Sequence, residues 1–503
     1  MIVLGKNARY GDPDYPTSHV QNVLLSPDAR KQGTYVIGTT GTGKSTLLVN
    51  MILQDIRAGE GVCLLDPHGD ITTDVLARVP RSRRDDVILF DPADLDYPFG
   101  LNLLDCNRDD PRERDLITST LIETLYKLFE YSWGPRMEDL LRHSILSLLL
   151  HDEPTTLVHL MMILVNYDHR QRLTERAKKL DPILRFYWED EFPESRLTGS
   201  GERRKTRDQA ELVASSLNKI GRFITNPVIR NIVGQPESTI NLREVMDEGK
   251  ILLVNLSKGD LGSDNSSLLG AVLVNQLLIA SLSRREIPEE KRRPFHLYVD
   301  EYQNFATKTF PQLQSEARKY AIDTTVAHQF RDQLDDENKG STLNVANVIC
   351  LRVSGKDSIE IAQQFDLTPP EAEPRFEPIV QEVGDNVFAN LVSPGTGTGL
   401  YRMVARDPQA YSDVHLETAN LLAQLRNHTA ICRILTAKER PRTLHQFRII
   451  LDDKPPVGES QVEYIRERSR GLCTYTREQV TQLIADYTSS DSGDGEIPIF
   501  TTE

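Results

Sequence analysis

Two adjacent carboxylates follow an apolar run in the segment FHLYVDEYQNFAT (295–307). The run 295–299 reads as a buried β-strand, so Asp300 and Glu301 stand at its carboxyl end. Two carboxylates at one strand end repel each other and resist burial. We therefore expect a positively charged group to lie at these two acids, with a solvated strand end as the alternative.

The segment GTTGTGKST (38–46) follows the first predicted strand and opens the first predicted helix. It satisfies the pattern G-x-x-x-x-G-K-[S/T], in which glycines let the backbone curl so that its N–H groups point at phosphate oxygens. Lys44 would reach the β- and γ-phosphates of ATP, and the Ser45 hydroxyl would ligate Mg²⁺. The alternative is a glycine-rich turn without nucleotide. The predicted nucleotide-binding residues are Gly38, Thr39, Thr40, Gly41, Thr42, Gly43, Lys44, Ser45 and Thr46.

The paired acids and the phosphate loop combine into one predicted site. In a P-loop fold, the strand that ends before Asp300 can lie beside the strand that precedes Gly38. Asp300 would then hold Mg²⁺, directly or through water. Glu301 would orient and deprotonate the attacking water as general base. Lys44 and the metal would offset the repulsion between the acids.

Two further polar residues follow the paired acids. Gln329 stands at the tip of the next predicted strand, TTVAH (324–328), where its amide could sense a γ-phosphate through one hydrogen bond. Arg318 lies on the predicted helix before that strand, from which it could reach the phosphate of a neighbouring subunit. An ordinary polar glutamine and a surface arginine are the alternatives at these positions.

Short β-branched runs predict the elements that position these residues. Helical patterns lie between several of the runs, as in residues 45–59 and 266–285. Continuous apolar strands alternating with helices indicate a doubly wound α/β fold with a mostly parallel sheet. The predicted strands are 34–38, 62–66, 87–91, 251–256, 296–300, 324–328 and 348–353, followed by 428–435 and 445–450.

A long stretch without strand signal interrupts this alternation. It is rich in helical periods and long enough for a helical domain of its own, and sheet strands resume after it, so we predict an inserted all-α domain. Its Gly- and Arg-rich run 196–208 reads as an exposed loop. The predicted division is a first part of the core (1–104), the all-α insertion (105–245), a second part of the core (246–452), a C-terminal helical segment (453–487) and a disordered acidic tail (488–503).

The composition is typical of a soluble globular protein. The 503 residues are 39% hydrophobic and 26% charged, and the net charge of −15 argues against a broad basic surface but permits a local basic channel. Five scattered cysteines without a CxxC pair predict reduced thiols in a cytoplasmic protein. The longest apolar run, 268–282, is shorter than a bilayer span, and the N-terminus lacks a signal-peptide pattern. We expect no intrinsic membrane span.

Taken together, the motifs resemble those of the HerA–FtsK superfamily of ring ATPases, in particular its type IV secretion coupling-protein branch. A further segment, SWGPRMEDLLRHSILSLL (132–149), falls in the predicted insertion, where coupling proteins carry an all-α domain. The segments that carry the resemblance, in family order, are GTTGTGKSTLL (38–48), LLDPHGD (64–70), VILFDPAD (87–94), YPFGLNLLD (97–105), LYVDEYQNFAT (297–307), SEARKYAI (315–322), VAHQ (326–329) and NVICLRVSGKDS (347–358).

The resemblance implies a RecA-like P-loop NTPase core and assigns roles to matching positions. Asp66, in LLDPHGD, joins the nucleotide-binding set without a specific role, and His68 is a candidate contact. Arg352 is a second candidate for a cross-subunit contact. The main roles are Walker A for Lys44 and Ser45, Walker B for Asp300 and Glu301, sensor for Gln329 and trans-acting arginine finger for Arg318.

The resemblance further implies a homo-hexamer that uses ATP and Mg²⁺ to translocate double-stranded DNA, in conjugation-like transfer, DNA processing or mobile-element defence. The run GERRKTR (201–207) is a candidate for channel contacts, with a solvated loop as the alternative. Membrane-anchored coupling proteins have N-terminal transmembrane helices, and the 37 residues before Gly38 are too few for them. We therefore expect the anchor to be missing and any recruitment to the membrane to depend on a partner.

Two other functions stay open from the sequence. A DNA-independent secretion or assembly ATPase would energise a protein complex and hydrolyse nucleotide at a rate that DNA does not change. A motor subunit could instead work with a separately encoded nuclease, relaxase or secretion-channel partner, because no nuclease signature is evident in the 503 residues.

Overall fold

The computed structural model describes residues 1–7, 22–192, 207–307, 309–365, 375–378, 401–404, 411–435, 441–449 and 458–489. Two predictions fall mainly outside them. The predicted acidic tail is described only at residues 488–489, and the predicted loop 196–208 only at its last two residues, which belong to a helix.

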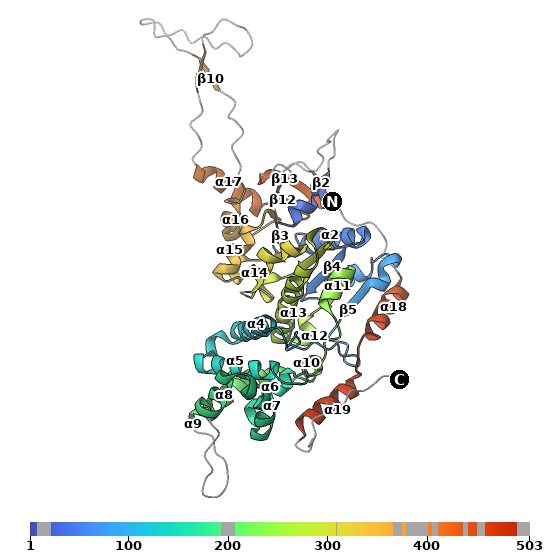
Figure 1. Cartoon of the computed structure of the whole chain (residues 1–503). Helices are drawn as coiled ribbons and strands as arrows, with labels where there is room; N and C mark the ends of the chain where they lie inside the picture. Colours follow the sequence, from blue (N-terminus) through green and yellow to red (C-terminus); the bar gives the residue numbers. More distant parts are fainter. Residues whose placement is uncertain are drawn as a thin grey trace, which may run out of the picture.

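One mixed sheet of eleven strands forms the centre of the described structure (Figure 1). Its strand order is β2-β1-β13-β12-β9-β3-β8-β7-β4-β6-β5. The strands from β9 to β5 pair in parallel. The strands are β1 (Ile2–Asn7), β2 (Asn22–Leu25), β3 (Thr34–Ile37), β4 (Gly61–Asp66), β5 (Val87–Phe90), β6 (Ile251–Asn255), β7 (Phe295–Val299), β8 (Ile322–His328), β9 (Asn347–Cys350), β12 (Thr429–Leu435) and β13 (Pro441–Ile449).

The parallel part of the sheet confirms the predicted α/β fold. Every residue of β3, β4, β7, β8 and β9 is buried, as expected for strands covered on both faces. Alternate residues of β3 enter different cores. Tyr35 and Ile37 pack in the core that contains helix α13 (Ser263–Ser283), and Val36 packs in the core that contains helix α2 (Lys44–Ala58).

The remaining strands extend the sheet in an antiparallel arrangement. β12 pairs with β9 and with β13, and β1 lies between β13 and β2. The sequence predicted β12 and β13 but not β1 or β2, which come from the other end of the chain. Strands β10 (Arg375–Pro378) and β11 (Tyr401–Val404) form a separate antiparallel pair.

Helix α13 is long and apolar enough to cross a membrane by length and composition. However, 72% of its most apolar window is buried inside the protein, as is typical of the core helix of a globular domain. It is the one helix among the described residues that passes this test. Asn275, which interrupts its apolar run, is buried and donates to the Thr120 carbonyl at 3.2 Å.

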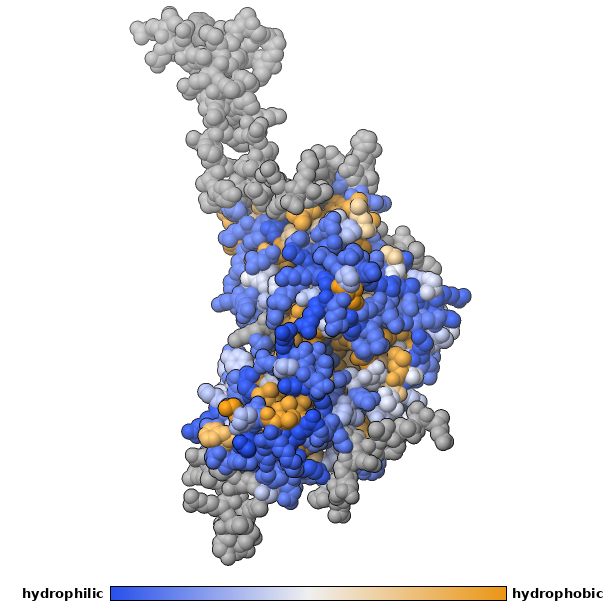
Figure 2. All heavy atoms as spheres, in the orientation of Figure 1, coloured by the Kyte–Doolittle hydropathy of each residue, from blue (hydrophilic) through white to orange (hydrophobic). Residues whose placement is uncertain are grey.

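A lobe of helices lies between β5 and β6 in the chain and projects from the sheet (Figure 1). No strand occurs among the described residues of this stretch. Exposed apolar side chains lie on its outer helices, and Figure 2 shows apolar areas on the lobe. These side chains are Val165, Leu180, Ile183 and Phe186. The helices of the lobe are α4 (Pro111–Phe129), α5 (Pro135–Leu149), α6 (Leu157–Val165), α7 (Tyr167–Leu180), α8 (Pro182–Phe186), α9 (Arg207–Ile224) and α10 (Pro227–Val233). Helix α11 (Leu242–Glu248), which follows them in the chain, packs on β4 and α13.

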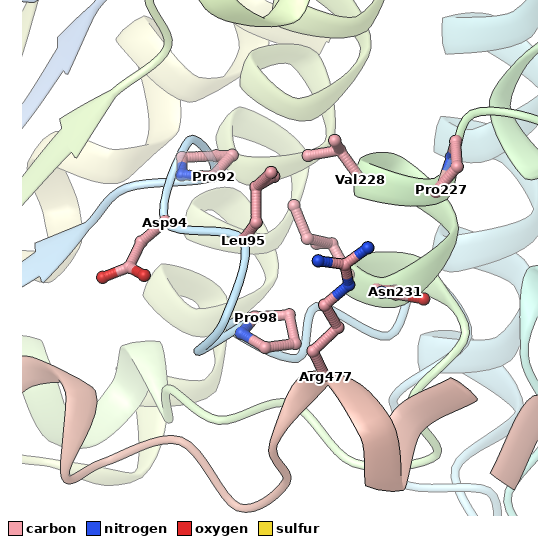
Figure 3. Close-up of a pocket in the computed structure, with 9 residues that line it drawn as sticks. Pro92, Asp94, Leu95, Pro98, Pro227, Val228, Asn231 and Arg477 are labelled. Atoms are coloured by element: carbon pink, nitrogen blue, oxygen red, sulfur yellow. The ribbon is translucent and has the colours of Figure 1, made fainter. Parts of the chain in front are cut away.

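The C-terminal helices contact both the sheet and this lobe. Helix α18 (Glu459–Arg470) packs on β5, and its Arg470 forms a 2.6 Å ion pair with Asp94. Helix α19 (Arg477–Thr488) packs on α6 and α10. At its start, Arg477 borders a cavity of about 50 Å³ between the loop 92–98 and α10 (Figure 3). The C-terminal segment therefore links the edge of the sheet to the inserted helices.

Candidate functional site

The loop between β3 and α2 has the conformation that its glycines permit. Gly41 has a φ of 76° and Gly43 a φ of 109°, values that residues with a Cβ rarely adopt. At Gly38, an added Cβ would lie 2.8 Å from the Cβ of Leu351 and from the Oγ1 of Thr42. The glycine spacing thus follows from the backbone path and from close packing on the segment after β9.

Neighbouring segments hold this loop from outside. The Thr39 amide donates to the Arg352 carbonyl at 2.8 Å, and the Thr42 hydroxyl donates to the Thr39 carbonyl at 2.7 Å. The amide of His428, just before β12, donates to the Thr42 carbonyl at 2.8 Å. Because the Thr42 carbonyl accepts this hydrogen bond, the antiparallel part of the sheet supports the loop conformation, as does the segment after β9. Sequence analysis did not identify His428 as a neighbour of the loop.

Lys44 opens helix α2 beneath the loop. Its ammonium group donates to the Gly38 carbonyl at 2.8 Å, and the residue is 7% exposed. Burial lowers the pKa of Lys44, while the nearby carboxylates of Glu301 and Asp300 raise it. The structure therefore brings the lysine and both acids together at the carboxyl edge of the parallel sheet.

One detail of the predicted arrangement is wrong. β7, which carries the acids, does not lie beside β3, because β8 lies between them and pairs in parallel with both. Two strand spacings amount to about 10 Å, a gap that side chains extending from the strand ends can close. The acids therefore face Lys44 across β8, whose carboxyl end contributes Gln329.

Asp300 is a buried acid with an unsatisfied oxygen. It is 4% exposed, its amide donates to the Leu65 carbonyl at 3.1 Å, and its Oδ1 has no hydrogen-bond partner. Burial, together with the negative charges of Glu301 and Asp66, raises the pKa of Asp300 to about 7, against the opposing effect of Lys44. A buried carboxylate oxygen without a donor fits the oxygen ligands that Mg²⁺ prefers. Ser45, which directly follows Lys44, is exposed.

Glu301 has an unusual backbone and two side-chain partners. Its φ of 44° lies in the left-handed region, which costs a non-glycine residue about 1–2 kcal/mol. Its carboxylate accepts from the Gln329 amide at 2.6 Å and from the Gln303 amide at 2.7 Å. The Gln329 carbonyl oxygen in turn accepts from the Thr40 hydroxyl at 2.8 Å. A chain of hydrogen bonds therefore joins the loop to the second acid.

Gln303 is a site residue that sequence analysis did not single out. It stands two residues after Glu301, and this proximity was the signal available in the sequence. Its amide holds the carboxylate oxygen that Gln329 leaves free. Each oxygen of the Glu301 carboxylate therefore accepts a hydrogen bond from a glutamine side chain.

Asp66 lies beside the site but its oxygens are occupied. They accept from the amides of His68 at 3.0 Å and Thr72 at 2.8 Å, which shapes the loop after β4 and the start of helix α3 (Asp70–Leu76). Asp66 is fully buried, and its charge raises the pKa of Asp300. His68 is exposed. Asp66 thus acts on the site through its charge and through the loop that it orders.

Arg318 lies at the opposite edge of the sheet from its own phosphate loop. It is exposed in the 3₁₀ helix η7 (Ala317–Tyr320), and its guanidinium donates to the side chain of Gln32. Gln32 precedes β3, whereas Gly38 follows it, so a strand length of about 13 Å separates the two ends. Arg352, by contrast, adjoins the loop through its carbonyl oxygen. The structure does not bring Arg318 to the site of its own chain.

Comparisons with known proteins give one family model that matches part of the chain and several solved structures that share its fold. The profile of the type IV secretion-system coupling protein DNA-binding domain matches residues 17–179. No curated protein matches the chain in sequence.

Solved structures of the plasmid coupling protein TrwB match most of the chain. The complex with the GTP analogue GDPNP has a TM-score of 0.55 and 16% identity, and the match covers 87% of this chain and 91% of that one. The complex with the ATP analogue ADPNP has a TM-score of 0.53 and 16% identity, over 92% and 97% of the two chains. The complex with ADP and Mg²⁺ has a TM-score of 0.52 and 16% identity, over 86% and 89%. The chain is thus similar to type IV coupling proteins, and its RecA-like core with a helical lobe is the fold of TrwB.

Proposed function

We propose that this chain is an ATP-hydrolysing, Mg²⁺-dependent DNA translocase of the coupling-protein type that works as a homo-hexamer. The observation that carries the proposal is the convergence of Lys44, Asp300 and Glu301 beside a glycine loop built to surround phosphate. Two of the matched TrwB structures are complexes with ADP and Mg²⁺ and with an ATP analogue, which supports the choice of ligands. The matched profile is that of a DNA-binding domain, which supports DNA as the partner.

The residues of the site divide the chemistry among them. Lys44 would turn from the Gly38 carbonyl to the β- and γ-phosphates, while the loop amides and the N-terminus of α2 bind their oxygens. Ser45 and Asp300 would hold Mg²⁺, which would supply positive charge to stabilise the negative phosphate oxygens. Glu301 would accept the proton of the attacking water, since its carboxylate is fixed by Gln329 and Gln303.

Gln329 would couple the phosphate loop to the base. Through one amide group, it contacts Thr40 in the loop and Glu301, which follows the neighbouring strand β7. A γ-phosphate bound in the loop can compete for either hydrogen bond. The orientation of Glu301 would therefore depend on whether the loop holds a triphosphate or a diphosphate, as a sensor requires.

Arg318 would act on the site of a neighbouring subunit. Its position at the opposite edge of its own sheet and its exposure both favour a role outside its own chain. An arginine donated in this way is worth about 10³–10⁵ in rate where it has been measured.

The free state of all five cysteines agrees with a cytoplasmic location, where a partner such as a nuclease, relaxase or secretion channel would set the pathway.

The test is the rate of ATP hydrolysis with Mg²⁺, measured with and without duplex DNA at low salt, alongside the mass of the particle in ATP. We expect DNA to raise the rate, with a stimulation that weakens steeply as salt increases. We expect the particle mass to correspond to six chains. If DNA leaves the hydrolysis rate unchanged, the translocase proposal is wrong and a secretion or assembly ATPase is favoured. If the protein does not hydrolyse ATP at all, the proposed active site is wrong.

A further inference from the structure

The main chain of the segment that carries Arg318, residues 317–321, accepts hydrogen bonds from several parts of the protein. We call it the finger segment. The last carbonyls of a helix lack partners within the helix and are satisfied by side chains, by tighter turns or by water. Here each of the five has a donor from the protein: the Ala321 amide for Ala317 and Arg318, Arg292 for Lys319, Arg284 for Tyr320 and the Phe295 amide for Ala321.

Arg284, at the end of α13, is the buried member of this set of donors. Its side chain is 0% exposed, and its guanidinium donates to the Tyr320 carbonyl and to the Arg293 carbonyl, each at 2.7 Å. It also forms a 2.9 Å ion pair with Asp247 on α11. Burial lowers the pKa of Arg284, and Asp247 counteracts this effect. One guanidinium therefore joins three segments at the amino edge of the sheet.

Arg292 is the half-buried member. Its Nη1 donates to the Lys319 carbonyl at 2.5 Å, and its guanidinium lies 5.2 Å from the ring centroid of Tyr320, a cation–π contact. Its Nε donates to the Ile287 carbonyl at 2.9 Å. Arg292 thus grips both the backbone and a side chain of the finger segment from the loop that leads into β7.

The backbone of the finger segment adopts a conformation that needs support. Ala321 has a φ of 61°, in the left-handed region that is unfavourable for a residue with a Cβ. Its carbonyl accepts from the amide of Phe295, the first residue of β7. The same strand ends at Val299, directly before Asp300 and Glu301. β7 therefore connects the acids of one site to the support of the arginine at the opposite edge.

We propose that Arg284 and Arg292 form a guanidinium clamp that positions Arg318 for the active site of the neighbouring subunit. The proposal rests on the proposed function, because it assigns positioning residues to the arginine that would act there. Desolvating a guanidinium such as Arg284 costs several kcal/mol before its partners compensate. Arg292 and Arg284 bind the consecutive carbonyls of Lys319 and Tyr320. Fixing the backbone in this way fixes the direction in which the Arg318 side chain leaves the surface.

The first test is the kinetics of Arg292→Ala, with Arg293→Ala as matched control. Arg293 is the adjacent arginine, and its side chain bonds the carbonyls of Glu248 and Gly59 rather than the finger segment. A misplacement of about 1 Å can cost about 100-fold in rate, so we expect Arg292→Ala to lower kcat about 10- to 100-fold. The KM for ATP should stay within about twofold, because the chain's own phosphate loop is untouched. Arg292→Lys should lie between the alanine variant and the wild type, and Arg293→Ala close to the wild type.

The second test separates positioning from general stability by mixing subunits. Arg292→Ala keeps an intact phosphate loop, and Lys44→Ala keeps an intact finger segment. In mixed rings, the intact phosphate loop of an Arg292→Ala subunit would lie next to the intact finger segment of a Lys44→Ala subunit. The hydrolysis rate per Arg292→Ala subunit should therefore rise. A thermal unfolding scan of each variant accompanies the assay. The double variant Arg292→Ala/Arg318→Ala should be no slower than Arg318→Ala alone, since a clamp that acts only through Arg318 has nothing left to position.

The outcomes distinguish this inference from the proposed function. Normal kcat in Arg292→Ala, with strong loss in Arg318→Ala, would overturn the clamp and leave the function standing. A loss in Arg292→Ala that mixing does not restore, or that adds to the loss in Arg318→Ala, would also overturn the clamp in favour of a purely structural role. Normal kcat in Arg318→Ala would instead overturn the cross-subunit arginine of the proposed function itself.

Discussion

The side-chain amide of Gln329 donates a 2.6 Å hydrogen bond to the carboxylate of Glu301, while its carbonyl oxygen accepts from Thr40 in the phosphate loop. One amide at the end of β8 thus links the two strands on either side of it. This contact explains how acids on β7 can belong to the same site as a loop that follows β3, although the two strands are not neighbours.

Replacing Gln329 by alanine should therefore damage turnover more than nucleotide binding. Without the amide, Glu301 loses one of its two side-chain donors, and a base displaced by about 1 Å can lose about 100-fold in rate. We expect kcat to fall about 10- to 100-fold and the KM for ATP to change little. Steady-state hydrolysis assays measure both, with Gln482→Ala on the exposed face of α19 as control. A Gln329→Ala protein with the kcat of the wild type would refute the link.

Replacing Glu301 by glutamine should leave binding intact and stop hydrolysis. Glutamine keeps the size of the side chain but cannot take a proton from water, and general-base catalysis contributes about 10²–10⁴ in rate. We expect kcat to fall by that factor while ATP stays bound. The measurement is single-turnover hydrolysis, with filter binding of labelled ATP on the same sample. Turnover close to that of the wild type would show that another group is the base.

Arg318→Ala should be inactive alone and recover activity when mixed with Lys44→Ala. Each variant supplies what the other lacks if the arginine of one subunit serves the site of the next. Removing such an arginine costs about 10³–10⁵ in rate. The check is hydrolysis across a series of mixing ratios, after the subunits have exchanged. Strictly additive activities in verified mixed particles would place Arg318 outside the neighbouring site.

A buried charge network below the site should make stability depend on pH. Arg30 on helix α1 (Pro27–Arg30) forms an ion pair with Asp55 at 2.6 Å, and His296 on β7 contacts Asp323 at 2.7 Å. Burial alone would lower the pKa of His296, but Asp323 and Asp55 outweigh it and raise the pKa. The network therefore joins β7 and β8 to the C-terminal part of α2 through the imidazole of His296.

The sign of the pH effect follows from that shift. A histidine whose pKa is higher in the folded chain than its unfolded value of about 6.5 stabilises the fold fully below that value. This contribution disappears as the pH rises through the folded pKa. We expect the gap in unfolding free energy between wild type and His296→Gln to be largest at acidic pH and to shrink at alkaline pH, as measured by denaturant titration. A gap that stays constant or widens with pH would contradict the charged state of His296.

The parts of the fold that the sequence predicts are those with a strong local signal. The parallel strands are continuous apolar runs because they are buried on both faces, so they are visible without knowing their neighbours. The glycine loop and the paired acids are visible for a similar reason, since each needs fixed residue types at fixed spacing. Chemistry concentrated in short segments can be identified from those segments.

The parts that the sequence does not predict depend on distant partners. β1 and β2 are short, Gly5 interrupts the first of them, and β1 pairs with β13 from the other end of the chain. The position of β8 between β3 and β7 follows from crossovers that no local pattern encodes. His428 reaches the phosphate loop only because β12 extends the sheet past β9. Such contacts follow from topology rather than from local periodicity.

The most direct test of the central claim is calorimetric titration of Mg²⁺-ATP into the wild-type chain and into Lys44→Ala. We expect saturable binding to the wild type. Affinity should be at least about 10-fold weaker in the variant, since charged hydrogen bonds contribute about 1.5–3 kcal/mol. No heat of binding in the folded wild-type protein, or equal affinity in the two proteins, would contradict the proposed nucleotide site at Lys44.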